Sequence, residues 1–404
     1  MTELDVPRAL EPSPFFLARS PYERHRQYRE LNRRGPVHRV VLPHGAQVWL
    51  VTGYEHARAA LTDPRLATTE PLFAEQLPPA LRSAVESQML NMDPPEHTRL
   101  RKLVTAAFTR RRVDGLAPRV QQLADELLEP LVGRAEAGFD LISEFTYPLP
   151  IAVICELLGV PPDGRDGFRQ WTSALVNATV LGADALVEAN AGMVEHLRAL
   201  IDQKRARPAD DLVSALVAAR DGGDRLSEDE LTSMLHLLIV AGHETTANLI
   251  ANEVRALLTT PGAWSRLVAE PERVPTVVEE ALRFDGPIQT TPQRRAREDF
   301  ELGGVPITGG DMVLIGLLAA NHDTEAIPDA DRFDPVREPV SHLAFGHGIH
   351  FCLGAPLARL EARVGLSSLL ARFPRLCLAA PEEEIVTAPG VLMNAMESLP
   401  VTVH

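Results

Sequence analysis

The sequence has few cysteines, few aromatic residues and too little positive charge to balance its acids. Its 404 residues include only Cys155, Cys352 and Cys377 as cysteines, which excludes a disulfide framework and favours a reducing compartment. Lys and Arg number 40 against 55 Asp and Glu, so the formal net charge is -15. Nucleic-acid binding depends on neutralising phosphates with Lys and Arg, and this charge balance disfavours it.

Long apolar runs, targeting patterns and linkers are also missing. The first thirty residues contain no apolar run near the ~20 residues that a membrane span needs, and no basic-then-apolar signal pattern. No Gly-x-Gly-x-x-Gly fingerprint for flavin or nicotinamide is present, and no repeat, charge run or Ser/Gly-rich linker divides the chain. We therefore expect one soluble cytoplasmic domain over residues 1–404, acting as a monomer without a membrane or nucleic-acid partner.

Helical periodicity dominates the chain and predicts a mainly α fold with a small β-sheet region. Residues 37–52 predict a β-hairpin, because β-branched residues flank a Pro-His-Gly turn. A second sheet segment is predicted over residues 300–314, with turns at its two Gly-Gly pairs. Helices are predicted over residues 97–108, 119–131, 147–158, 185–204, 228–259 and 355–373.

The clearest helix is the one predicted over residues 228–259. Ser227 and Glu230 match the Ser-x-x-Glu capping box, Leu226 and Leu231 can pack across it, and Pro261 ends it. At ~1.5 Å per residue this helix would span roughly 45 Å, enough to cross the molecule.

The middle of this helix reads Ala-Gly-His-Glu-Thr-Thr and is unusually polar. Gly242 costs about 1 kcal/mol relative to alanine in a helix. Helical spacing puts Ala241, Glu244 and Thr245 on one face, while His243 leans away. Thr245 can donate to the carbonyl of Ala241, which would open a notch for oxygen and water. The alternative is an ordinary kinked core helix with Glu244 in a salt bridge.

Residues 345–354 read F-G-H-G-I-H-F-C-L-G and place Cys352 between glycines that let the backbone turn closely around its sulfur. A thiolate presented in this way suits haem iron, because it pushes electron density onto the metal and favours O–O cleavage. The alternative is a buried cysteine on a glycine-rich turn. The joint fit of ten positions favours the metal-ligand loop.

This stretch resembles the haem-ligand signature of the cytochrome P450 family, with Phe345, Gly348, Cys352 and Gly354 at the signature positions. The polar stretch of the long helix is similar to that family's oxygen-activation motif, in which an acid and an alcohol relay protons. The resemblance covers essentially the whole chain and is strongest to actinobacterial hydroxylases of macrolides and other polyketides. It implies a triangular helical prism around a buried haem b (iron protoporphyrin IX), with Cys352 as the iron ligand.

The resemblance also implies roles for other residues. Glu244 and Thr245 would deliver protons, and Phe345 and Ala241 would contact the haem. Its two propionates need cations or donors, and motif position implies His97, Arg101, Arg294 and His350, with Arg295 as the neighbour most easily mistaken for Arg294.

Glu280 and Arg283 form an i, i+3 pair, which taken alone predicts a solvated surface bridge. The pair is similar to the Glu-x-x-Arg helix of the family, where it is buried and braces the cysteine loop. The usual third partner comes from the segment before that loop. Arg332 and His342 are both candidates, and the sequence does not separate them.

The substrate pocket implied by family position is mostly apolar, which suits a large hydrophobic, oxygenated ligand. Residues 90–92 bring no acid to bind an amino sugar, so we favour a neutral macrolactone or similar polyketide over a cationic glycoside, with Glu75 and Glu86 as the acids that could still serve. The pocket would also include the region 172–190. The individual residues expected in it are Leu90, Asn91, Met92, Val240, Ile288, Gln289, Thr291, Leu392 and Met393.

The implied activity is insertion of one oxygen atom from O2 into a hydrophobic secondary metabolite, by hydroxylation or epoxidation. Electrons would come from a ferredoxin and a separate ferredoxin reductase using NAD(P)H, steered by a basic cluster. The alternatives are oxidation of a terpenoid, steroid or aromatic compound, peroxide-driven or coupling chemistry, and a haem sensor that turns nothing over. An intact acid-alcohol pair speaks against the peroxide route. The basic cluster comprises Arg99, Arg101, Lys102, Arg110, Arg111 and Arg112.

Overall fold

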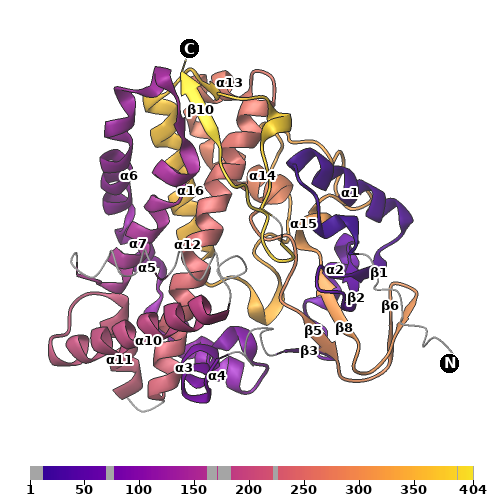
Figure 1. Ribbon diagram of the computed structural model, residues 1–404, viewed down its shortest axis with the longest axis vertical. Helices are drawn as coiled ribbons and strands as arrows, with labels where there is room; N and C mark the ends of the chain where they lie inside the picture. The colour runs from indigo at the N-terminus through magenta and orange to yellow at the C-terminus, as the bar shows by residue number, and fades with distance from the viewer. Residues whose placement is uncertain are drawn as a thin grey trace, which may run out of the picture.

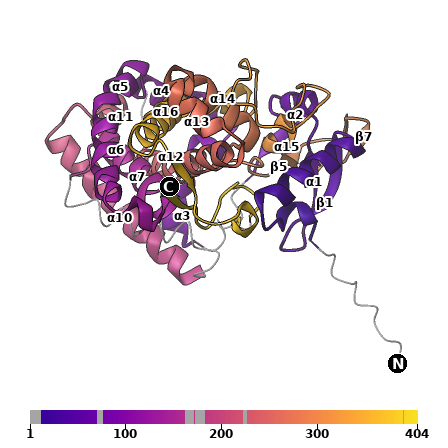
Figure 2. The same cartoon turned by 90° about the horizontal axis from the view of Figure 1, so that it is seen from above.

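The computed structural model describes residues 12–69, 77–161, 171, 183–221, 226–388 and 390–403. Its larger part is helical, and a smaller part combines short helices with most of the β-structure (Figures 1 and 2). The helical part contains α3 (Pro79–Glu86), α4 (Glu96–Ala107), α5 (Arg110–Gly115), α6 (Ala117–Val132), α7 (Pro148–Leu158), α10 (Ala183–Ala206), α11 (Leu212–Asp221), α12 (Glu228–Thr259), α13 (Ala263–Ala269), α14 (Val274–Asp285) and α16 (Ala355–Arg372). The smaller part contains α1 (Pro21–Arg34), α2 (Tyr54–Ala60) and α15 (Leu317–Asn321).

The predicted helices are confirmed to within two residues at each end, and the mainly α class is confirmed with them. None of the helices within the described ranges combines the length and the apolar content that a membrane crossing requires.

The strands form three sheets. The five-stranded sheet runs β1 (Val37–Val41), β2 (Gln47–Val51), β8 (Met312–Ile315), β5 (Arg294–Ala296) and β3 (Leu66–Thr68). The three-stranded sheet runs β4 (Phe139–Asp140), β10 (Pro400–Val403) and β9 (Leu376–Leu378), and the third is the hairpin of β6 (Phe300–Leu302) and β7 (Val305–Ile307).

The hairpin predicted over residues 37–52 is confirmed as β1 and β2, which pair antiparallel from Val37–Val51 to Val41–Gln47. The segment 300–314 divides in a way that the sequence pattern did not predict. Gly303 and Gly304 turn β6 into β7 at φ of 58° and 79°, but β8 leaves this hairpin and pairs parallel with β2. A parallel neighbour lies far away in sequence, so no local turn signal marks it.

Helix α12 crosses the helical part between α7 and α16 (Figure 1). Its capping box is confirmed, because Ser227 Oγ accepts from the Glu230 N–H at 3.1 Å and a Glu230 carboxylate oxygen accepts from the Ser227 N–H at 2.7 Å. The helix remains α-helical through Gly242. A Cβ at that position would lie 3.5 Å from Ile154, an ordinary contact, so packing against α7 does not require glycine there.

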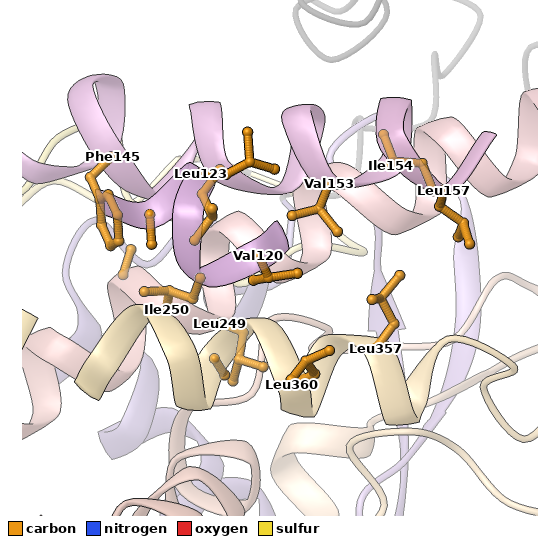
Figure 3. Packing of buried hydrophobic residues seen from close by; sticks show 14 of the residues in the cluster. Val120, Leu123, Phe145, Val153, Ile154, Leu157, Leu249, Ile250, Leu357 and Leu360 are labelled. Carbon is orange, nitrogen blue, oxygen red and sulfur yellow. The ribbon is translucent and has the colours of Figure 1, made fainter. Parts of the chain in front are cut away.

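The main core lies where α12 packs against α6, α7 and α16. Figure 3 shows Val120 and Leu123 of α6, Val153, Ile154 and Leu157 of α7, and Phe145 facing Leu249 and Ile250 of α12 and Leu357 and Leu360 of α16. At Gly365 of α16 a Cβ would lie 3.4 Å from Ile250, an ordinary contact, so α16 and α12 pack at normal distance there. This packing fixes α12 relative to the start of α16, which follows Cys352 directly.

A buried ion cluster joins α14 to the segment that leads into the cysteine loop. Arg283 is fully buried and donates from Nε and Nη2 to the two Glu280 carboxylate oxygens, each at 2.7 Å. Its Nη1 donates to the carbonyls of Asn321 at 3.0 Å and Ala330 at 2.7 Å. Asn321 in turn accepts from the N–H of Leu343 at 2.7 Å. The pair is therefore a buried brace and not a surface bridge.

The third partner of this cluster is Arg337, and neither candidate from the sequence was right. Arg337 Nε donates to Glu280 at 3.1 Å. Arg332 contributes only its main-chain carbonyl, which accepts from Arg283 at 2.9 Å, and its side chain is exposed. His342 contacts Glu279 instead, at 3.2 Å. The turn at residues 328–334 brings Arg337 back onto Glu280, which sequence distance did not reveal.

We expect Arg337→Met to lower the free energy of unfolding by about 1.5–3 kcal/mol, because a buried carboxylate loses a charged donor. The matched change Arg332→Met removes an exposed arginine whose main-chain carbonyl, and not its side chain, joins the cluster, and the free energy of unfolding should stay within about 0.5 kcal/mol. Urea unfolding of both variants measures the difference. Equal losses would contradict the assignment of Arg337.

Candidate active site

A cavity of about 440 Å³ lies between α12 and the cysteine loop. Its walls come from the middle of α12, the start of α16, the chain after α14 and a loop near the C-terminus. Most side chains that line it are apolar, and its polar groups come from widely separated positions in the sequence. The cavity therefore collects most of the residues that the motifs singled out.

The cysteine loop presents Cys352 to this cavity. Gly346 and Gly348 adopt φ of 71° and 73°, the left-handed region that favours glycine. A Cβ at Gly348 would also lie 2.7 Å from the Thr62 side chain. Burial raises the pKa of the Cys352 thiol, while the N–H groups of Gly354 and Ala355 act in the opposite direction. The loop thus supplies donors that suit a thiolate.

Four nitrogen-bearing side chains converge on the cavity from three parts of the chain: His97 and Arg101 on α4, Arg294 on β5, and His350 in the loop. The rings of His97 and His350 lie 4.4 Å apart. Both ring nitrogens of His97 and Nε2 of His350 are buried without a hydrogen-bond partner. Burial lowers the pKa of both histidines, that of His350 to about 4, so both are neutral donors near pH 7.

Strand alternation separates Arg294 from Arg295. Arg294 is buried and lines the cavity, whereas Arg295 is exposed on the other face of β5. Arg101 also lines the cavity and donates to the Phe351 carbonyl at 2.6 Å. Neither Arg101 nor Arg294 has a carboxylate ion-pair partner among the described residues. Arg294 is buried and Arg101 is half-buried, and cations without such partners in this setting call for an anionic ligand.

These features fit a haem. Its carboxylates would meet the two arginines and the orphaned histidine nitrogens, and Cys352 would meet the iron. No group of three or more His, Cys, Asp or Glu in the described part of the chain could hold a metal ion. An iron at Cys352 therefore needs its remaining ligands from a cofactor.

Glu244 and Thr245 project from α12 into the same cavity. Thr245 Oγ1 donates to the Ala241 carbonyl at 2.6 Å, as the sequence predicts. Burial raises the pKa of Glu244 to about 7. No ion pair of Glu244 is found among the described residues, which argues against the salt-bridged core helix. His243 points the other way and packs its ring edge-on against Tyr147 at 4.2 Å.

Six of the nine expected substrate-pocket residues line the cavity, and Ala241 and Phe345 line it as well. The six are Leu90, Val240, Ile288, Thr291, Leu392 and Met393. Because these six come from four separate segments, the cavity wall depends on how those segments are held together.

Asn91, Met92 and Gln289 do not line the cavity. Asn91 turns its amide to the Glu86 carbonyl at 3.4 Å, and Met92 packs against the main core. Gln289 is fully buried and donates to the Gly390 carbonyl. Leu90 and Ile288, which directly precede Asn91 and Gln289, do line the cavity, so these segments are correctly located although the three side chains point elsewhere.

Other parts of the expected pocket have a different outcome. Residues 172–182 and Glu75 lie outside the described residues. Asn190 is buried against His236 at 3.0 Å, and Glu86 does not line the cavity.

Several lining residues were missed, including Thr69, Leu237, Gln293 and Glu361. Glu361 of α16 is the most notable, because it is buried, one of its carboxyl oxygens has no partner, and burial raises its pKa well above the ordinary range. An acid within an apolar helical stretch nine residues after the ligand cysteine was the available signal.

Comparison with known proteins decides the family. The cytochrome P450 family model matches residues 183–397. The chain belongs to the cytochrome P450 family. It is 47% identical to cytochrome P450 107B1 of Saccharopolyspora erythraea over 388 residues, 94% of this chain and 95% of that protein.

Two further relatives carry substrates in their names. The mycinamicin IV hydroxylase/epoxidase of Micromonospora griseorubida is 43% identical, with 93% of this chain and 94% of that protein covered. The tirandamycin C-bound structure of the P450 monooxygenase TamI superposes with a TM-score of 0.86 at 43% identity, covering 94% of this chain and 97% of the other. The protein is thus a haem-dependent monooxygenase with the cytochrome P450 fold.

We expect the reduced carbon monoxide complex to absorb at the long-wavelength position of thiolate haem, because the sulfur orbital mixes with the porphyrin transition. Cys352→His should lose this band. Cys155→Ala and Cys377→Ala are the matched controls and should keep it. A thiolate spectrum that survives in Cys352→His would overturn the assignment of the ligand.

The Glu244 carboxyl should hold its proton up to about pH 7, because burial raises its pKa to about 7. It is therefore protonated below that pH and loses the proton as the pH rises through it. Infrared difference spectra between the wild type and Glu244→Gln should show a protonated-carboxyl band that disappears around pH 7. Glu361→Gln is the control, since its band should persist through this range. Titration of Glu244 near its ordinary value of 4.5 would show that the side chain is solvated.

Proposed function

We propose that this P450 inserts one oxygen atom into a C–H or C=C bond of a neutral macrolactone or a similar polyketide. The observation that supports this most is the largely apolar lining of the cavity that also holds Glu244, including Leu90, Val240, Ile288 and Met393. The names of two relatives point to mycinamicin IV and tirandamycin C as ligands of such cavities. A hydroxylation or an epoxidation would both suit this lining.

In this proposal one set of residues ligates the haem iron and another set binds the haem propionates. Cys352 ligates the iron, and its thiolate is supported by the N–H groups of Gly354 and Ala355. His97, Arg101, Arg294 and His350 hold the propionates as donors, which explains why neither arginine has a protein carboxylate for itself. Bound haem supplies the activation of dioxygen. The remaining chemistry is proton delivery and substrate placement, which the protein provides.

Glu244 and Thr245 are the proposed proton carriers. A carboxyl with a pKa of about 7 is a donor and an acceptor at the working pH, as general acid catalysis requires. The Thr245 hydroxyl now donates to Ala241 at 2.6 Å and can turn from that carbonyl toward the cavity. A water held between the two side chains would complete a path into the cavity.

The charge of the wall supports a neutral substrate. The lining acids are Glu244 and Glu361, and burial raises the pKa of both. A cationic amino sugar would be best held by an ionised carboxylate, and the described lining has no acid with an ordinary or lowered pKa. A neutral macrolactone meets hydroxyl and amide groups instead, including Thr69, Thr291 and Gln293.

The deciding experiment supplies the holoenzyme with a ferredoxin system and compares 6-deoxyerythronolide B, which has no amino group, with mycinamicin IV, which carries an amino sugar. We expect an oxygenated product, by mass spectrometry, from the first only. Products from the second alone would reverse the substrate class. The same panel includes a steroid and a terpenoid. Consumption of NADPH without an oxygenated product from any of these compounds would count against a monooxygenase that acts on polyketides.

Proton delivery has its own test in the same reaction. Thr245→Ala and Glu244→Gln should keep haem and substrate binding, since neither side chain ligates iron. The ratio of product to NADPH consumed should fall at least about tenfold, because a positioned proton-transfer group contributes roughly 10²–10⁴-fold to a rate, and hydrogen peroxide should rise to match. His243→Gln, on the far side of α12, is the control. Unchanged coupling in both variants would remove the pair from the mechanism.

A P450 of this bacterial type takes electrons from a redox partner, and we propose a ferredoxin that docks beside the cysteine loop. The basic cluster predicted from the sequence is smaller in the structure. Arg99 pairs with Glu230, Arg101 faces the cavity, and Arg112 pairs with Asp210 at 3.1 Å. The remaining docking patch is Lys102, Arg110 and Arg111, with Ile349 and Phe351 exposed on the nearby loop. Arg110 has an ion pair with Asp114 at 3.6 Å, but both side chains are solvent-exposed, which leaves its charge at the surface.

Reversing the charge of Lys102, Arg110 and Arg111 together should slow ferredoxin-supported turnover and flatten its dependence on salt, because steering is screened over ~10 Å at 0.1 M ionic strength. Substrate affinity should change little. The matched control reverses Arg26, Arg33 and Arg375, which are exposed elsewhere and change net charge equally. Equal slowing in the two triple variants would place the docking surface elsewhere.

A further inference from the structure

Two segments that line the cavity are joined along their length. Ile288 and Met393 form an isolated antiparallel bridge. The N–H of Gln289 donates to the Leu392 carbonyl at 2.9 Å, and the N–H of Asn394 donates to the Pro287 carbonyl at 2.8 Å. Residues 287–291 and 390–394 therefore move as one unit, which we call the double wall.

The double wall is attached to α12 by one amide. Asn252 Nδ2 donates to the main-chain carbonyl of Asp285 at 2.9 Å and to that of Asn394 at 3.0 Å. Asn252 is buried and lies seven residues beyond Thr245 on the same helix. Its two bonds fix the base of both segments relative to the helix that carries Glu244 and Thr245.

A charged cluster holds the same base from the outside. The Asp285 carboxylate accepts from Arg255 of α12 and from Asn394 Nδ2 at 2.8 Å. The oxygen of the Asn394 side-chain amide accepts from Arg24 of α1. Arg24 is only 2% exposed, and no ion pair of its own is found within the described ranges. The buried Arg24 cation thus meets the Asp285 anion through the amide of Asn394.

This arrangement locks the Asn394 amide in one orientation. Its oxygen faces a cation, and its nitrogen faces the Asp285 carboxylate and the Gly286 carbonyl at 3.0 Å. Turning the amide over would place its donors against a buried cation and its oxygen against a buried carboxylate, and each mismatch is costly in a low-dielectric interior. The side chain next to Met393 therefore has a single low-energy position.

We propose that Arg24, Asn394 and Asp285 are positioning residues that set the distance between the double wall and α12, and so determine which part of a bound substrate lies against Glu244 and Thr245. Arg24 does not line the cavity. It reaches the double wall through Asn394, and it also donates to the Ala388 carbonyl at 3.5 Å, just before residues 390–394. The inference rests on the proposal that this cavity holds the substrate. Its structural half, that the three residues hold the double wall, is testable without any substrate.

The deciding measurement is amide hydrogen exchange of the holoenzyme in Arg24→Met. Exchange should rise at least about fivefold at residues 286–291 and 390–394 together, because a lost buried charged hydrogen bond corresponds to roughly 1 kcal/mol or more. Arg24→Lys keeps a cationic donor and should restore most of the protection. Asn394→Leu should exceed Arg24→Met, since it removes the side-chain bonds to Arg24, Asp285 and Gly286 together.

The control is Lys204→Met, which breaks another buried ion pair, with Asp211, that joins α10 to α11 away from the double wall. It should leave exchange of the two segments unchanged. If Arg24→Met fails to fold, Arg24→Lys and Arg24→Gln supply the same comparison. Unchanged exchange in every folded Arg24 variant, or a rise in only one of the two segments, would overturn the proposal.

The affinities of two azoles distinguish a positioning role of Arg24 from a general loss of stability. Imidazole is too small to fill the cavity, whereas clotrimazole carries three aromatic rings, and both are followed by optical titration. Arg24→Met should weaken clotrimazole at least about fivefold and leave imidazole within about twofold, with full recovery in Arg24→Lys. Equal weakening of both would mean that the cluster only stabilises the fold. Neither outcome depends on whether the natural substrate is a macrolactone.

Discussion

The cavity brings together cationic side chains that have no carboxylate partner among the described residues. The rest of the structure depends on this excess of positive charge. Arg101 and Arg294 reach it from α4 and β5, and the orphaned nitrogens of His97 and His350 face the same space. Burying such groups is unfavourable unless an anionic ligand completes them. The haem would therefore be a cofactor and also the ligand that completes these polar groups in the interior of the fold. We infer that folding and haem binding are strongly linked.

Maintaining the open space requires rigid walls, and buried polar clusters provide them at two places. Glu280, Arg283 and Arg337 fix the segment before the cysteine loop, while Asp285, Asn394 and Arg24 fix the double wall. Both clusters meet at the C-terminal end of α14, where Arg283 and Asp285 are two residues apart. One helix thus aligns the iron-ligand side and the substrate side of the cavity. Apolar packing alone would tolerate small shifts between them, whereas oriented hydrogen bonds do not.

The sequence predicted the features that depend on local chemistry. The capping box at Ser227, the Thr245 bond to Ala241 and the left-handed glycines around Cys352 follow from short patterns. It did not predict contacts that depend on how distant segments meet. Arg337 was missed because a turn brings it back to Glu280, and the pairing of β8 with β2 was not predicted because parallel pairing leaves no local signal. Arg24 gave no signal, since arginine at the start of a helix is ordinarily exposed.

The distinction between local patterns and contacts of distant segments also explains which expected pocket residues do not line the cavity. Motif positions locate a segment, but the side of the segment that faces the cavity depends on its hydrogen bonds. Gln289 lies between Ile288 and Thr290, yet its side chain is directed to Gly390 because the double wall pairs there. The Gln289 amide holds the two segments together and is therefore not available to bind a substrate. The wall therefore presents apolar side chains and Thr291 to the cavity, and it directs the amides of Gln289 and Asn394 into the hydrogen bonds that hold the two segments. A substrate of a different shape would be accommodated by changing Ile288, Leu392 or Met393 while Gln289, Asn394 and Asp285 stay in place.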